Sequence, residues 1–176
     1  VFHLNVQLPG NADPVITSDL TADELEHGIS RQIFESLSFH VYGDDADGNP
    51  LRLTGKGNVF DMAAYNMTFP FAAGVAHVSS QFNWTLLCDK INLVSKDTFE
   101  LMFIVVDDVN KCRLYKADTL TVNVNVLPPD NTAPQLTVSS TNPDMPFIDN
   151  QQTLFVGQQI SLGLASSDAD TWPLDH

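Results

Sequence analysis

Three short segments of the chain are rich in side-chain oxygens. They are Asp44, Asp45 and Asp47; Asp107, Asp108 and Asn110; and Asn11 with Asp13. Carboxylate and amide oxygens are the ligands that Ca²⁺ takes in proteins, about six to eight at a time. Carboxylates crowded together repel one another, and a bound cation removes that cost. If the fold brings the three segments together, the sequence predicts a calcium site.

Aspartate and asparagine also have a simpler use, because their side chains hydrogen-bond to the nearby backbone and so favour turns. The D-x-D spacing adds to the metal interpretation, since Asp45 and Asp47 then project on the same side of an extended loop. Both interpretations, turn and calcium site, remain open at the level of the sequence.

The elements that would position these segments are β-strands. Apolar and polar residues alternate over residues 37–42, 80–86 and 120–126, which predicts strands of an antiparallel sheet with one wet face. Residues 101–106 are apolar on both faces, which is typical of a central strand whose second face is also covered. Thr21 followed by Glu24 is a capping-box pattern and predicts a helical turn.

Short strands separated by turn signals over about 115 residues predict an all-β fold, an antiparallel β-sandwich of immunoglobulin-like or cadherin-like type. In such a sandwich the loop after the second strand and the loop before the last strand lie at the same end. The linker that enters the domain arrives there too. We therefore expect the three oxygen-rich segments to meet.

A repeat within the sequence sets the domain organisation. Residues 37–51 and 160–174 share their apolar alternation, D-A-D and P-L at an offset of 123 residues (160 − 37). Pro14 and Pro134 end two similar linkers. A repeat of this length is a whole β-domain, so the sequence predicts a tandem array. We expect residues 1–10 to be the last strand and linker of a preceding repeat, 11–128 a complete repeat, and 129–176 the linker and first strands of the next.

The predicted ligands follow from this organisation. For the complete repeat they are Asn11, Asp13, Asp45, Asp47, Asp107 and Asp108, and for the next repeat Asp130, Asn131, Asp168 and Asp170.

Charge and cysteine content restrict partners and compartment. Eight basic and 22 acidic residues give a net charge of −14, which argues against nucleic acid and anionic membrane surfaces as partners. No run of about 18 apolar residues is present, so we expect no membrane insertion. Cys88 and Cys112 are compatible with one disulfide in an oxidising compartment, or with two buried free thiols.

Signatures of catalysis are missing from the sequence. The five histidines lack the H-E-x-x-H spacing of a zinc site, and no G-x-S-x-G elbow occurs. Trp84 alternates with Phe82 on the inward face of its predicted strand, so we expect both in the core. We therefore expect a chain that is not an enzyme.

Four motifs resemble the dystroglycan-type cadherin-like repeat of giant bacterial surface proteins. They are D-A-D-G-N-P-L at residues 45–51, F-N-W-T at 82–85, F-I-V-V-D-D at 103–108 and T-L-T-V-N-V at 119–124. The positions of Cys88 and Cys112 resemble those in repeats from Bacteroidota, which form gliding-motility-associated adhesins. The resemblance implies an extracellular stalk of repeats with Ca²⁺ at the junctions. Cadherin repeats carry an acidic motif with a glutamate just before the strand that residues 101–106 would form, and residues 96–100 do not match it. This departure favours one ion rather than three.

The function expected from these observations is a structural and adhesive tandem-repeat segment of a large secreted or cell-surface protein. Its partners would be neighbouring repeats of the same chain, and surface polysaccharide or other cell-surface proteins. The alternative is an ancillary, non-catalytic module of a secreted polysaccharide-active enzyme.

Overall fold

The computed structural model describes residues 2–5, 10–107, 115–141 and 151–170. The chain divides into two compact units, Val1–Pro129 and Asp130–His176, which are described separately below.

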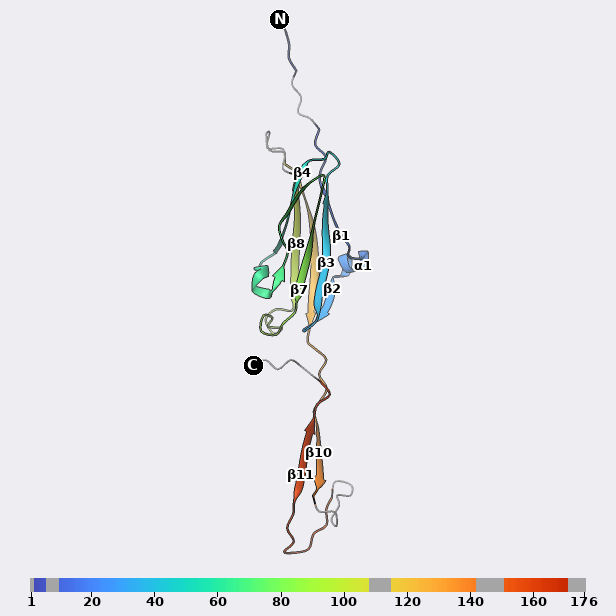
Figure 1. Cartoon of the computed structure of the whole chain (residues 1–176), viewed down its shortest axis with the longest axis vertical. Helices are drawn as coiled ribbons and strands as arrows, with labels where there is room; N and C mark the ends of the chain where they lie inside the picture. Colours follow the sequence, from blue (N-terminus) through green and yellow to red (C-terminus); the bar gives the residue numbers. More distant parts are fainter. Residues whose placement is uncertain (1, 6–9, 108–114, 142–150, 171–176) are drawn as a thin grey trace. The chain divides into compact units, whose positions relative to one another are not determined.

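The first unit is a sandwich of two β-sheets (Figure 1). One sheet has the strand order β1-β3-β7-β5 and the other β2-β9-β8-β4-β6. The strands are β1 (Val15–Ser18), β2 (Ile29–Gln32), β3 (Ser36–Asp44), β4 (Pro50–Gly57), β5 (Met67–Thr68), β6 (Ala72–Val75), β7 (His77–Thr85), β8 (Thr98–Asp107) and β9 (Ala117–Leu127). The orders β1-β3-β7-β5 and β4-β8-β9 correspond to the A-B-E-D and C-F-G sheets of an immunoglobulin-type sandwich.

Two helical turns connect strands of this unit. Helix α1 (Ala22–His27) begins at Thr21, whose hydroxyl accepts from the Glu24 backbone N–H while the Glu24 carboxylate accepts from the Thr21 N–H. The hydrogen bonds that the Thr21 backbone N–H and hydroxyl donate to this carboxylate lower the pKa of Glu24. A 3₁₀ turn, η1 (Met62–Tyr65), precedes β5. The capping-box prediction is thus confirmed.

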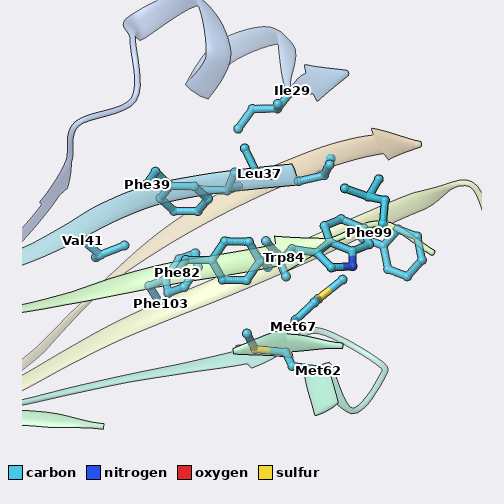
Figure 2. Packing of buried hydrophobic residues seen from close by; sticks show 14 of the residues in the cluster. Ile29, Leu37, Phe39, Val41, Met62, Met67, Phe82, Trp84, Phe99 and Phe103 are labelled. Atoms are coloured by element: carbon cyan, nitrogen blue, oxygen red, sulfur yellow. The ribbon is translucent and has the colours of Figure 1, made fainter. Parts of the chain in front are cut away.

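The core lies between the two sheets and contains a cluster of aromatic rings among aliphatic side chains (Figure 2). Phe39 of β3 packs against Phe82 of β7 and Phe103 of β8, with ring centroids 4.9 and 5.5 Å apart. Trp84 is 1% exposed, and its indole N–H donates to the Tyr65 carbonyl at 2.9 Å. A buried indole needs such a partner, so the sequence places Trp84 beside the turn that supplies one.

The structure confirms the predicted sandwich and refines it at two points. Strand β2 pairs with β9 in parallel, from Ile29 opposite Val124 to Gln32 opposite Leu127, whereas the prediction had antiparallel strands throughout. The outward residues of the central strand β8, Met102, Ile104 and Val106, are only half-buried, so within the described residues this face is not fully covered.

The segment expected to be the last strand of a preceding repeat has no strand assigned in its described part, residues 2–5. Phe2 and Leu4 are exposed there. A strand requires a neighbour that pairs with its backbone, and none of the described residues pairs with this segment.

The second unit contains an antiparallel pair, β10 (Gln135–Ser140) and β11 (Leu162–Ser167). Its register matches that of β1 with β3. Ile16 pairs with Gly43 and Leu136 with Ser166; Ser18 pairs with Val41 and Val138 with Leu164. The sequence repeat is therefore also a repeat of strand pairing.

Candidate metal site at the entering linker

The loop between β3 and β4 is built around Asp45, which is 7% exposed. Its Oδ1 accepts hydrogen bonds from the backbone N–H groups of Asp47 at 2.8 Å and Asn49 at 3.1 Å. Gly48, at φ +73°, completes the turn with a backbone hydrogen bond to the Asp45 carbonyl. The turn interpretation of these acids is therefore correct for Asp45 Oδ1.

The linker before β1 is bound to this loop. The Ala12 N–H donates to Asp47 Oδ2, and the Asn49 side-chain amide donates to Asn11 Oδ1 at 2.6 Å. The Asn11 amide in turn donates to Asp107 Oδ2 at 2.5 Å. Asn11 therefore joins the linker to both the β3–β4 loop and the end of β8.

Asp107 is the last residue of β8 and is fully buried. A buried carboxylate is costly unless it is hydrogen-bonded or paired. Besides the Asn11 amide, the Lys116 backbone N–H donates to Asp107 Oδ1 at 2.5 Å. Strand β8 thus ends at a carboxylate that ties the linker to the start of β9.

Asp13 contacts a cation of the chain itself. The Lys116 ammonium lies 2.7 Å from Asp13 Oδ1, and both side chains are exposed, 43% for Lys116 and 71% for Asp13. The hydrogen bond from Lys116 to Asp13 raises the pKa of Lys116, and the charges of Asp13, Asp107 and Asp47 act in the same direction.

The three predicted segments therefore meet at one end of the first unit. Of the six ligands predicted for the complete repeat, Asn11, Asp13, Asp45, Asp47 and Asp107 lie in this network. Asp108, together with Asn110, lies outside the described residues.

The carboxylate of Asp45 has a second oxygen at this end of the unit. Asp45 Oδ2 is buried and has no hydrogen-bond partner. An unpaired buried carboxylate oxygen carries a desolvation cost that a bound cation would remove. Within the described residues no three Asp, Glu, His or Cys side chains are grouped closely enough to hold a metal. The carboxyl groups therefore fit an ion only together with amide or backbone oxygens.

The second unit repeats the hydrogen bonds between linker and loop, which we call the clamp. The Thr132 N–H donates to Asp170 Oδ2, as Ala12 does to Asp47, and the Asp170 N–H donates to Asp168 Oδ1 at 2.9 Å. The Thr132 hydroxyl adds a second donor at 2.7 Å, and these hydrogen bonds lower the pKa of Asp170. The other two predicted ligands, Asp130 and Asn131, are exposed linker residues.

The sequence prediction missed two residues of this site. Asn49 enters the prediction only as part of the D-A-D-G-N-P-L motif, and Lys116 carries the wrong charge for a metal ligand. The available signal for Lys116 was a rare basic residue, in a chain of 8 basic and 22 acidic residues, placed shortly before the predicted strand at residues 120–126.

The predicted disulfide stays a prediction, because Cys112 lies outside the described residues. Cys88 is exposed, which does not agree with the alternative of two buried thiols. No helix of the described residues is long and apolar enough to cross a membrane.

The strand order and the core define the first unit as an immunoglobulin-like β-sandwich, and the second unit holds the antiparallel strand pair β10 and β11. No protein-family model matches its sequence, and no curated protein does.

Several solved structures resemble the chain at low identity. The SrpA adhesin from Streptococcus sanguinis is 11% identical, with 79% of this chain and 73% of that chain covered and a TM-score of 0.46. A PapD-like domain of human CEP192 is 8% identical, covers 74% of this chain and 97% of its own, and has a TM-score of 0.43. AggA, a fimbrial subunit from Escherichia coli, is 10% identical, with 69% and 100% covered and a TM-score of 0.36. Likenesses of this size assign neither a family nor a function.

Proposed function

We propose that this chain is a structural and adhesive tandem-repeat segment of a large secreted or cell-surface protein. The supporting observation is that both the strand register and the clamp between linker and loop occur twice. The hydrogen bonds of Ala12, Asp45 and Asp47 recur at Thr132, Asp168 and Asp170. Hydrogen bonds that recur at each linker are suited to fixing the path of the chain between one repeat and the next.

The clamp supports this role because it restrains the linker itself. Pro14 is buried and Asn11 is half-buried, and the linker between them is bound to the β3–β4 loop. Each immobilised residue loses backbone freedom that a flexible linker would keep. An array built from such linkers would hold its repeats apart rather than let them fold onto one another.

A single Ca²⁺ at the first unit forms part of the proposal. Within the described residues, Asp45 would hold it with at most one further carboxylate, completed by the Asn11 amide oxygen and backbone oxygens. The buried Oδ2 of Asp45 is the observation that supports it. The ion would supply positive charge that the carboxylates at this end share. Its binding would add to the hydrogen bonds that already fix the linker.

Calcium titration of the chain tests this site. We expect the melting temperature to rise in millimolar Ca²⁺, because a ligand at about 100 times its Kd stabilises the folded state by about 2.7 kcal/mol. The Asp45→Asn variant should lose this response. Asp89→Asn is a matched control, since Asp89 is exposed and its ion-pair partner is Lys90. No shift in the wild-type chain, or an equal shift in Asp45→Asn, would contradict the calcium site.

Electron microscopy of the longest natural chain that contains this segment tests the structural role. Negative-stain images should show a thin, extended filament of repeated units. A compact particle built around a catalytic domain would support the ancillary-module alternative instead. Trp84, buried in the core, offers no flat surface for a sugar in this segment.

A further inference from the structure

Lys116 occupies a position that an ion-binding site would ordinarily keep free of positive charge. It is the residue before β9, and it contacts two of the three segments that meet at the linker end. Its ammonium lies 2.7 Å from Asp13 Oδ1. Its backbone N–H donates to Asp107 Oδ1, and its carbonyl accepts from the Asp107 N–H at 3.0 Å.

The backbone bonds to Asp107 fix where the side chain of Lys116 begins. Asp107 is fully buried at the end of β8, so the main chain at Lys116 is held against a rigid strand. From that point the side chain reaches the linker at Asp13. The pair joins the linker to β9 by a contact that needs no bound ion.

The ammonium contacts one carboxylate of this end, that of Asp13, and so neutralises charge that would attract a cation there. The raised pKa of Lys116 has Asp13 as its first cause, followed by the charges of Asp107 and Asp47. Two cations that interact with the same acids repel each other, and one neutralises charge that would attract the other. The positive charge of Lys116 therefore opposes the binding of a second cation.

We propose that Lys116 is a resident counter-cation that holds the linker on the domain without an ion and weakens Ca²⁺ binding at the acidic loops. This inference rests on the calcium part of the proposed function. Lys116 would keep the linker attached to the domain at low Ca²⁺. It would also raise the Ca²⁺ concentration at which the site is half occupied.

The test compares Lys116→Met with wild type by calorimetric Ca²⁺ titration of the whole chain, and by thermal melting in EDTA. Lys90→Met is the matched control, because it removes the same charge from an exposed ion pair with Asp89. Lys116→Arg keeps the charge. We expect Lys116→Met to bind Ca²⁺ about tenfold more tightly and to melt at a lower temperature in EDTA. Lys90→Met and Lys116→Arg should bind as the wild type does.

Two results would overturn the proposal, each for a different reason. Equal Ca²⁺ affinity of Lys116→Met and wild type would leave the calcium site standing and remove the role of Lys116. Absence of binding in both proteins at about 10 mM Ca²⁺ would remove the calcium site itself. Binding by the variant alone would support the proposal, since the lysine would then block the site. If Lys116→Met does not unfold cooperatively, Lys116→Gln takes its place in both measurements.

Discussion

Lys96 packs its charged end against aromatic rings at the opposite end of β8 from the linker site. Its ammonium lies 3.9 Å from the centroid of Phe60 and 4.7 Å from that of Phe99, with Tyr65 at 5.4 Å. The three rings also contact one another edge to face. A cation over a ring face is attracted by the ring quadrupole, more strongly where water is partly excluded. Lys96 is half-buried, so we expect this contact to stabilise the fold measurably.

Replacing Lys96 by methionine tests that contact. The change keeps an unbranched side chain against the rings but removes the charge, so we expect a loss of about 1 kcal/mol in the free energy of unfolding. Urea unfolding monitored by tryptophan fluorescence measures it. Lys90→Met should lie within about 0.5 kcal/mol of wild type, because exposed ion pairs contribute little. Equal stability of Lys96→Met and wild type would show that the rings gain nothing from the cation.

At the level of elements, the alternating segments were predictable because one face of each strand is buried and the other is wet. The predicted strands at residues 37–42 and 120–126 lie within β3 and β9, and the one at 80–86 extends one residue past the end of β7. The pattern could not predict the parallel pairing of β2 with β9, since alternation determines which face is buried but not the direction of the neighbouring strand.

The candidate site was predictable to a similar extent. The sandwich topology brings the linker, the β3–β4 loop and the end of β8 together, so acids on these segments meet whatever their exact partners are. The partners were not predictable. Donors such as the Asn49 amide and the Lys116 ammonium depend on side-chain directions that the spacing of residues does not contain.

The close approach of the two sheets near the linker site depends on Gly43. A Cβ placed on Gly43 of β3 would lie 2.6 Å from Val105 Cγ2 and 3.0 Å from Val78 Cγ1. Both neighbours are buried, and Val105 belongs to β8 in the facing sheet. A larger residue here would push β3 and β8 apart two residues before Asp45 and Asp107, respectively.

We therefore expect Gly43→Ala to lower the free energy of unfolding by about 1–3 kcal/mol, the usual cost of overpacking a core. Gly10→Ala is the matched control, since nothing lies within 4 Å of a Cβ there and it should change stability by about 0.5 kcal/mol at most. Urea unfolding measures both. A fully stable Gly43→Ala variant would mean that the sheets can separate at this end without loss. If Gly43→Ala is destabilised, Ca²⁺ titration of the same variant then shows whether the spacing of the sheets also sets the site.

Taken as a whole, the molecule uses one strand-pairing pattern in two different environments. In the first unit Phe39 and Val41 of β3 are 3% and 0% exposed. At the corresponding positions of β11, Leu162 and Leu164 are 43% and 68% exposed. The pairing register is the same, so the difference lies in what packs over the apolar face. An isolated pair of strands is marginally stable in water, whereas a closed sandwich is cooperative.

Hydrogen–deuterium exchange of the whole chain should reveal this difference directly. Amides of β3 and β8 are expected to exchange only by global unfolding of the first unit, because they pair on both sides within its sheets. Amides of β10 and β11 should exchange about a thousandfold faster or more, since a single strand pair with exposed apolar residues opens locally. Mass spectrometry of peptides from the two units, labelled in the same sample, provides an internal control. Equal protection of both units would show that β10 and β11 are covered in solution, in which case Leu162 and Leu164 would be the residues to label in a search for the covering surface.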